Sequence, residues 1–541
     1  MTDQPIGNGR QPSPPPTPAE AGTTAQAVNL ATRHLCAGVY LDHRYCDRVL
    51  HDVYEDDGSA VAPYTGAETA AVLAHAKRAR MLNTVEAAVL LVLLVGTVCA
   101  GGPIFASVAL VLVVWQVILS AASLSRDLRA GRRVTGSLVL LGFVAAAVAL
   151  YVVTGALASR TADSNDPYSS MDGGSSAEPD ILGGASVLMV LLLAATVLTT
   201  GIIRGRLIAR VGAGWVPPVD GDRRLARVEA REHAKVSVYS DFNPFTHAGE
   251  RTDFWRFALD LRPPEGGVPA AHEPGSWPMF DVDSLVGHIG RFLQGLDGDY
   301  GRFARIPDLR VEDRFVISGR DTAHPDHADP PTGEAERVMR YPFEAMRHYL
   351  KCQVVSWSGE VVTTVYVHTA LQGRTLYLEF QAFVMPPTRD DFHVFGVSGG
   401  AFGAGLAALR QMPRLIWRVP AVLARSAASV LNSQGAPIDV GAKTSVRLLG
   451  TEPGFGNYFQ WRDPHKYVAI LERQLFVALV DFLRGKVDLA ELEARAATVI
   501  NNGVINNGAG SNVNVGVAGS GNSGNSVNSV GNVKGNVGQP G

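Results

Sequence analysis

The chain has 541 residues and a formal net charge of −3, and only 18% of its residues are charged. This length predicts two or three modules, and the absence of a basic excess argues against nucleic acid as a partner. The four cysteines form no Cys-x-x-Cys pair, so we expect neither a disulfide framework nor a zinc site, and no cofactor motif is present.

The N-terminal region is predicted to be a leader followed by helices. Residues 1–28 are rich in Pro, Gly and Thr and are expected to be disordered, and 29–83 are expected to form a cytoplasmic helical cap. Its amphipathic helices are predicted at 29–55 and 67–80. Four of its residues are of metal-ligating types: His34, Cys36, His43 and Cys46. Their spacing fits no zinc pattern, so a structural role is favoured.

Residues 84–203 are predicted to form a four-helix transmembrane module. The expected spans are about 85–101, 103–123, 136–158 and 181–203. Gly101-Gly102-Pro103 divides the first apolar run, which is otherwise much longer than a hydrocarbon core of about 30 Å. Four spans place every basic flanking cluster on the cytoplasmic side. Because the bilayer core contains no ionisable side chain, the spans are interpreted as an anchor and not as a transporter.

After a linker at 204–229, residues 230–500 are predicted to form a cytoplasmic α+β domain with an antiparallel sheet. The strand-like segments are Val236–Tyr239, Phe254–Leu261, Arg310–Ile317, Cys352–Trp357, Val361–His368 and Thr375–Val384. The last three are separated by short turns and are expected to form a meander. Helices are predicted at Val282–Leu296, from Pro464 to about Arg484, and at Asp488–Val499.

One segment of this domain, 392–431, begins with glycines and continues as an apolar helix with an arginine stripe. The stripe consists of Arg410, Arg414, Arg418 and Arg425. Such a helix can lie on an anionic membrane surface, or it can be a core helix with a solvated arginine face, and the pattern favours neither.

The glycines of this segment include Gly396-Val397-Ser398-Gly399-Gly400, which fits G-x-S-x-G. This pentapeptide resembles the nucleophile elbow of patatin-like lipases, and the resemblance implies Ser398 as a nucleophile. The glycine-rich oxyanion loop of that family is missing, and Asp439-Val440-Gly441 is the nearest match to its Asp-Gly partner. Four other polar residues, His324, Asp326, His327 and Asp329, are expected in a solvated loop. We therefore assign no catalytic residue and no metal ligand.

The tail, residues 501–541, is a low-complexity sequence of Asn, Gly, Val and Ser. Val513-Asn514-Val515-Gly516 resembles the tetrad of RIP-homotypic-interaction-type amyloid signalling motifs, with Asn in place of the usual Gln. The resemblance implies self-assembly through cross-β stacking. A flexible, disordered end is the alternative.

The whole chain is similar to uncharacterised actinobacterial multi-pass membrane proteins, which imply no activity. We expect a multi-pass protein of the cell membrane with both termini in the cytoplasm. Its predicted function is that of a non-enzymatic, membrane-anchored interaction or signalling module, and the alternative is a membrane-proximal serine hydrolase acting on lipids. The expected partners are membrane lipids, an unidentified protein and further copies of the chain, bound through the transmembrane helices or the tail.

Overall fold

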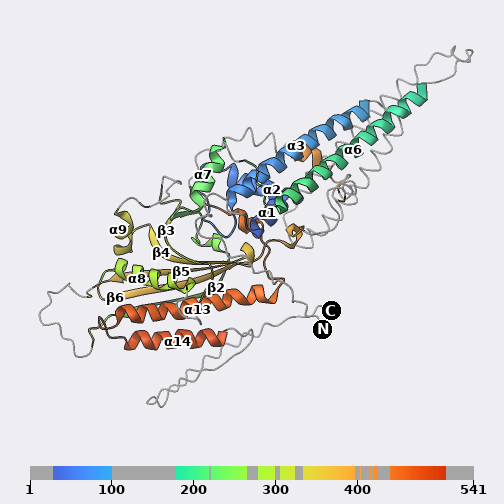
Figure 1. Cartoon of the computed structure of the whole chain (residues 1–541). Coiled ribbons are helices and arrows are strands. Elements are labelled where there is room, and N and C mark those ends of the chain that lie inside the picture. The colour runs from blue at the N-terminus through green and yellow to red at the C-terminus, as the bar shows by residue number, and fades with distance from the viewer. Residues whose placement is uncertain are drawn as a thin grey trace, which may run out of the picture.

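The computed structural model describes most of the chain outside the two ends and one long internal segment. The described residues are 28–99, 178–218, 221–264, 278, 280–298, 305–322, 330, 333–395, 403, 408, 415, 418–423 and 439–506. They form a sheet domain, a group of N-terminal helices at one end of the sheet, and a long two-helix arm (Figure 1).

The centre of the sheet domain is a six-stranded sheet with the order β1-β3-β4-β5-β6-β2. The strands are β1 (Val236–Tyr239), β2 (Glu250–Asp260), β3 (Leu309–Ser318), β4 (Arg347–Ser356), β5 (Val361–Gln372) and β6 (Thr375–Met385). β1 pairs with β3 in parallel, and the other neighbours are antiparallel. The sheet is therefore mixed, and the prediction of an antiparallel sheet is corrected at β1.

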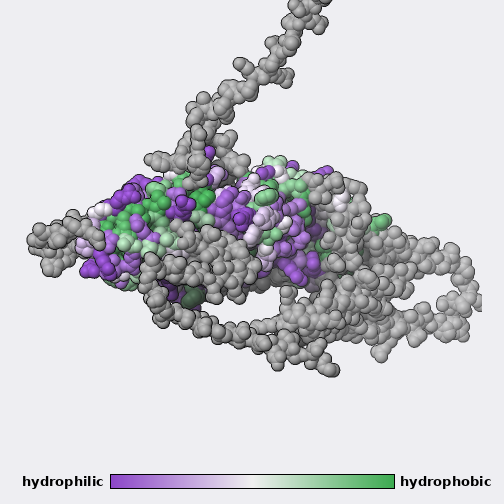
Figure 2. Space-filling model, turned by 90° about the horizontal axis from the view of Figure 1, so that it is seen from below, coloured by the Kyte–Doolittle hydropathy of each residue, from purple (hydrophilic) through white to green (hydrophobic). Residues whose placement is uncertain are grey.

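Helices cover one face of this sheet (Figure 1). They are α8 (Val282–Gln294), α13 (Tyr458–Leu483) and α14 (Ala490–Asn506), and α14 packs on α13. Alternate residues of β4, namely Leu350, Cys352 and Val354, point into the core beneath them because strand side chains alternate between faces. Seen from below, hydrophilic and hydrophobic residues lie side by side on the surface of this layer (Figure 2).

The N-terminal helices pack together at one end of the sheet. They are α1 (Leu30–Leu41), α2 (His43–Val49), the π-helical turn η2 (Leu50–Tyr54), α3 (Thr69–Cys99), α6 (Glu178–Gly212) and α7 (Arg223–Glu232). Leu35 and Val39, one turn apart on α1, are fully buried with residues of α2, α3, α6 and α7. Phe392 and Val446 of the sheet domain join the same core.

Short elements complete the described chain. They are η3 (Thr246–Ala248), η4 (Gly295–Asp297), α9 (Glu334–Arg340), η5 (Trp357–Gly359), η6 (Asp390–Phe392) and α12 (Val446–Leu449). η5 connects β4 to β5, whereas η6 and α12 lie next to α1 and α2. These connections bring the sheet domain into contact with the N-terminal helices.

The prediction of four transmembrane helices is wrong. In the described part of the chain, one helical window, Leu191–Gly212, is long and apolar enough to cross a membrane. The expected span 85–101 is no separate element, because α3 runs unbroken from Thr69 in the predicted cap to Cys99. The expected spans 103–123 and 136–158 lie outside the described residues. An apolar run was a poor guide because it does not show where a helix begins or which of its residues face a neighbouring helix, as Leu90 and Val197 do here.

The strand predictions are confirmed. The last three strand-like segments form the antiparallel meander β4-β5-β6, and the other three correspond to β1, β2 and β3. The three predicted helices correspond to α8, α13 and α14, although α14 continues to Asn506. The alternation of apolar residues identified the strands but contained no information on the parallel pairing of β1 with β3.

Candidate functional site

Helix α1 docks on a strained turn between β4 and β5. Trp357, Ser358 and Gly359 have positive φ angles of 54°, 56° and 94°, which residues other than glycine rarely adopt. A Cβ atom on Gly359 would lie 2.7 Å from Nδ2 of Asn29, the N-cap residue of α1. The turn therefore holds the next residue, Glu360, against α1.

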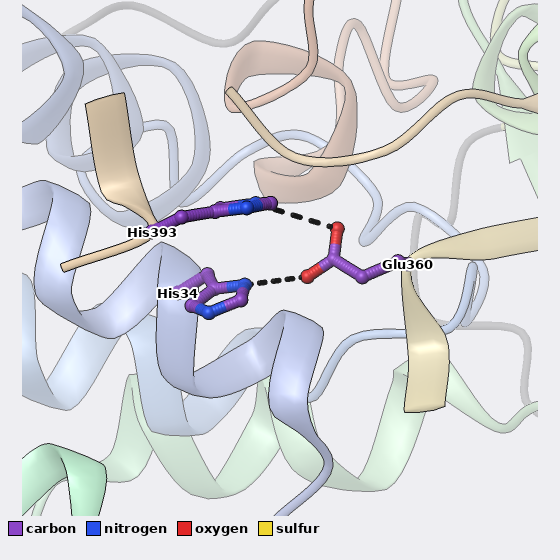
Figure 3. A group of neighbouring side chains, drawn as sticks. All are labelled: His34, Glu360 and His393. Atoms are coloured by element: carbon purple, nitrogen blue, oxygen red, sulfur yellow. Dashed lines mark hydrogen bonds and ion pairs between the residues drawn. The ribbon is translucent and has the colours of Figure 1, made fainter. Parts of the chain in front are cut away.

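Glu360 receives hydrogen bonds from two segments that are distant in sequence. His34 Nδ1, on α1, donates to Glu360 Oε1 over 2.6 Å (Figure 3). Thr388 donates its backbone N–H and its hydroxyl to Glu360 Oε2, each over 2.8 Å. Both oxygens of this buried carboxylate therefore have donors.

His393 completes the cluster from the segment after β6. Its ring stacks on His34 with centroids 4.0 Å apart, and its Nε2 lies 3.8 Å from Glu360 Oε2. His393 Nε2 also lies 2.8 Å from the hydroxyl of Thr388. Because the hydroxyl hydrogen is donated to Glu360, the hydrogen between Thr388 and His393 must belong to His393. Both imidazoles face the same carboxylate (Figure 3).

The charge state of the cluster follows from these contacts. Burial raises the pKa of Glu360, but the hydrogen bond from His34, the positive charge of Arg447 and the donors of Thr388 outweigh burial and hold the pKa at about 2. Burial lowers the pKa of His393, and the neighbouring His34 contributes to this decrease. At neutral pH, Glu360 is therefore ionised and His393 is neutral.

Arg447 supplies the buried positive charge behind Glu360. Its Nη2 donates to the carbonyl oxygens of Glu360 and Pro386 over 2.6 and 2.9 Å. Burial lowers its pKa to about 10, so the guanidinium remains charged at neutral pH. Beside it, Tyr45 of α2 donates its hydroxyl to the carbonyl of Val446 over 3.2 Å. These contacts connect the N-terminal helices to the segments that follow β6.

The arrangement around Glu360 is better suited to a hydrogen-bonded carboxylate than to a metal ion. The donor atoms of His34, Glu360 and His393 lie within 4.8 Å of one another, and these residue types do bind zinc. However, the two rings are stacked, and both carboxylate oxygens already accept hydrogen bonds. A metal would have to displace these hydrogens. We therefore interpret the Glu360 cluster (His34, Glu360, Thr388, His393 and Arg447) as a hydrogen-bonded joint around a buried carboxylate.

A second His–Glu cluster lies between the end of α7 and the start of α3. Its members are Glu68, Glu232 and His233, with donor atoms within 4.8 Å of one another. Among the described residues, these and the Glu360 cluster are the two groups whose geometry can hold a metal. We call this second group the Glu232 cluster.

The arm formed by α3 and α6 projects from the body (Figure 1). Apolar side chains of both helices are exposed on it. Val92 on α3 is 70% exposed and Leu191 on α6 is 60% exposed. Between the helices, Glu86 forms an ion pair with Arg204 and accepts a hydrogen bond from Thr200 over 2.7 Å. The charged groups of the arm therefore pair inside it, whereas apolar groups face outwards.

A basic belt surrounds the base of the arm. The guanidinium groups of Arg78 on α3 and Arg210 on α6 lie 5.2 and 5.9 Å from the ring centroid of Trp215. Beside them lies a groove of about 700 Å³ with apolar residues such as Met81 and Ile203 on its walls and Lys77 at its rim. The belt separates the apolar arm from the polar body.

Most residues singled out in the sequence lie outside the described part of the chain. These are Val513, Asn514, Val515 and Gly516 of the tail, Arg410, Arg414 and Arg425 of the stripe, Ser398, and the loop residues His324, Asp326, His327 and Asp329. Arg418 is described and is half-buried, and its Nη1 lies 3.4 Å from His43 Nδ1. This contact places Arg418 beside α2.

Asp439, the nearest match to a lipase Asp-Gly partner, has a local structural role. Its Oδ1 accepts the backbone N–H of Gly441 over 2.9 Å, and its Oδ2 accepts the hydroxyl of Ser240 over 3.1 Å. The segment 439–442 thereby joins the end of β1, where Tyr239 bridges Ala442.

The four metal-type residues of the cap do not form a common site. Cys36 and Cys46 are buried, burial raises the pKa of both thiols, and Cys46 Sγ donates to the carbonyl of Ala76. His34 binds Glu360, whereas His43 contacts Arg418.

Sequence reasoning missed Glu360, His393 and the whole Glu232 cluster. Glu360 and His34 are 326 residues apart, and no motif connects them. Glu232 is 163 residues from Thr69, whose N–H it binds. The one local signal was the Trp357-Ser358-Gly359 turn, which identifies a tight connection but not the helix that docks on it.

The comparisons with known proteins give one match. Residues 254–514, just under half of the chain, match the AbeC-like domain family, whose name describes no activity. No curated protein and no solved structure matches the chain. The matched region includes most of the sheet and the helices that cover it, and it excludes β1, the N-terminal helices and the arm. The sheet domain of this chain is therefore similar to an AbeC-like domain.

Proposed function

We propose that this chain is a non-enzymatic, membrane-attached interaction module, with the arm of α3 and α6 in contact with lipid and the sheet domain held beside the membrane. The observation that carries the proposal is the exposed apolar surface of the arm, where Val92 and Leu191 face outwards. Large exposed apolar surfaces are rare in soluble monomers and indicate contact with lipid or with another protein.

The basic belt supports lipid as the partner of the arm. Arginine, lysine and tryptophan are enriched where a protein crosses the membrane–water interface, because the basic groups attract anionic head groups and the indole ring lies among them. Arg78, Arg210 and Trp215 form this combination where the apolar surface ends. The neighbouring groove has apolar walls that suit a lipid chain, and the ion pair of Lys77 with Asp222 lies at its edge.

The Glu360 cluster would connect the arm to the sheet domain. α1 contacts both α3 and α6, and Arg33 of α1 donates to the carbonyl of Gly212 at the end of α6 over 3.0 Å. On the same helix, His34 binds Glu360. A displacement of the arm therefore acts on the sheet domain through α1, which is the coupling that an interaction module at a membrane needs.

The tail provides the interaction part of this proposal. The resemblance of Val513-Asn514-Val515-Gly516 to amyloid signalling tetrads suggests recruitment of further copies or of a protein with a similar motif. Membrane attachment would raise the local concentration of tails.

The test is flotation of the purified full chain with vesicles of phosphatidylcholine and phosphatidylglycerol. In the arm variant, Val92→Asp with Leu191→Asp, each carboxylate in lipid costs about 2.5–3.5 kcal/mol, so we expect at least about a tenfold loss of floating protein. The matched control places the same charges on the body, as Phe242→Asp with Phe343→Asp, at residues that are 96% and 71% exposed. This control should float like the wild type. Equal flotation of all three proteins would rule out lipid contact by the arm.

A further inference from the structure

The Glu232 cluster is held rigidly by backbone contacts. Glu232 is the last residue of α7, and His233 follows it as the C-cap. Thr69 N–H, at the start of α3, donates to Glu232 Oε2 over 2.9 Å, and Tyr64 N–H donates to the Glu232 carbonyl over 2.7 Å. Glu68 directly precedes α3. The side chains therefore meet where two helix ends are fixed.

Among the described residues, one oxygen of this cluster accepts no hydrogen bond. The Glu232 side chain is fully buried, and its Oε1 has no hydrogen-bond donor among the residues that the structure describes. A buried carboxylate oxygen without a donor is costly, so native proteins usually supply a donor, a water molecule or an ion. Glu68 brings a second carboxylate close by and thus adds negative charge. A cation would satisfy both groups.

The three donor atoms are spaced almost as a metal ion requires. His233 Nε2 lies 3.6 Å from Glu232 Oε1 and 3.8 Å from Glu68 Oε2. Tetrahedral zinc with bonds of about 2.1 Å places its ligands about 3.4 Å apart. The two separations from His233 match this spacing to within a few tenths of an ångström, and all three donor atoms lie within 4.8 Å of one another. Tyr64 stacks on His233 with ring centroids 5.0 Å apart and orients the imidazole.

The cluster is also accessible from solvent. The side chain of His233 is 51% exposed and that of Glu68 is 38% exposed, whereas Glu232 forms the buried floor. A cation can therefore enter from the surface, and water can complete its coordination. One imidazole and two carboxylates are ligands that suit zinc and similar divalent transition metals.

We propose that Glu68, Glu232 and His233 bind a divalent transition-metal cation, for which Zn²⁺ is the probe. The site fixes the first turn of α3 to the last turn of α7. This inference does not depend on the proposed function, and the residues lie outside the region that matches the AbeC-like domain.

The test is isothermal titration of Zn²⁺ into the full chain, in detergent and without a histidine tag. We expect one strong site in the wild type and at least about a tenfold weaker affinity for Glu232→Gln and for His233→Ala, because each removes a ligand. Glu232→Gln keeps the size of the side chain, and its melting temperature in EDTA shows whether the variant is folded.

His393→Ala is the matched control, because it removes a histidine from the other His–Glu cluster. Zinc affinity that is retained in His393→Ala and lost in the two Glu232-cluster variants supports the proposal. The proposal fails if the wild type binds no zinc, if Glu232→Gln and His233→Ala bind as tightly as the wild type, or if His393→Ala is the variant that loses binding.

Discussion

Around Glu360 and around Glu232, a buried carboxylate faces a histidine, but the two surroundings differ in the hydrogen-bond donors that they supply. Glu360 accepts from His34 and twice from Thr388, with Arg447 behind it. Glu232 has one backbone donor and a second carboxylate beside it. The comparison teaches that burial alone does not decide the charge of a carboxylate; the donors and charges around it do.

The pKa values of the two carboxyl groups express this difference. The pKa of Glu360 is lowered to about 2, because His34, Arg447 and Thr388 outweigh its burial. The pKa of Glu232 is raised to about 8, because its burial and the neighbouring Glu68 outweigh the donor from Thr69. Without a metal, Glu360 is therefore a stable anion at neutral pH, whereas Glu232 retains a proton.

The largest expected effect is that of Glu360→Ala. Removing this anion leaves the buried guanidinium of Arg447 without its counter-charge, which should lower the free energy of unfolding by about 3–5 kcal/mol. Urea unfolding measures the change. Glu452→Ala is the control, because Glu452 is a 60% exposed ion-pair partner of Arg389 and should contribute at most about 0.5 kcal/mol. Equal effects of the two substitutions would contradict the interpretation of Glu360 as a buried joint.

A smaller effect is expected from Gly359→Ala, which tests the docking of α1 on the turn. Gly359 has a φ of +94°, and a Cβ atom there would press on Asn29, so the substitution should cost about 2–3 kcal/mol. Gly373→Ala is a matched control, because Gly373 also has a positive φ, +59°, but no neighbour within 4 Å of the added atom. Its cost should be about 1 kcal/mol. If the two substitutions lower the free energy of unfolding equally, the contact of Asn29 with the turn does not contribute to stability.

The last prediction concerns the dependence of stability on pH in EDTA. In the unfolded chain the carboxyl group of Glu232 loses its proton above about pH 4.5, whereas in the folded protein it keeps the proton up to about pH 8. The contribution of Glu232 to the free energy of unfolding therefore decreases as the pH rises from about 4.5 to about 8. Glu232→Gln should remove the decrease. Glu360 acts in the opposite direction, because its contribution is present above 4.5 and is lost as the pH falls towards about 2.

Urea unfolding of the wild type, Glu232→Gln and Glu360→Gln between pH 3 and pH 9 measures both slopes. The stability difference between the wild type and Glu232→Gln should change above about pH 4.5, and that for Glu360→Gln below it. If both stability differences changed with pH in the same direction, the pKa values of Glu232 and Glu360 would not be shifted in opposite directions, and the interpretation would be wrong.

The sequence was informative wherever structure depends on neighbouring residues. Alternation of apolar side chains identified the meander of β4, β5 and β6, and the amphipathic pattern of 29–55 predicted the helical segment that forms α1, α2 and η2. Strand order and the parallel pairing of β1 depend on connections over long distances, so local patterns do not contain them.

The clusters could not be predicted for the same reason. Each combines residues that are more than a hundred positions apart, and neither His34 nor Glu232 has a local sequence that distinguishes it from an ordinary surface residue. The four predicted spans failed differently, because an apolar run such as that of α3 has the same composition whether it faces lipid or another helix.

The contact of Tyr45 with Val446 has a consequence for biosynthesis. These residues are 401 positions apart, and Arg447, which places its charge behind Glu360, follows immediately. At roughly 5–20 residues per second on the ribosome, roughly 20–80 s pass between the synthesis of Tyr45 and that of Val446. During that interval Tyr45 has no native acceptor and His34 gains its acceptor, Glu360, only after 326 further residues, whereas the apolar arm has already been made. Nascent chains should therefore need a chaperone or the translocation machinery to shield α1 and α3 until translation has passed residue 447.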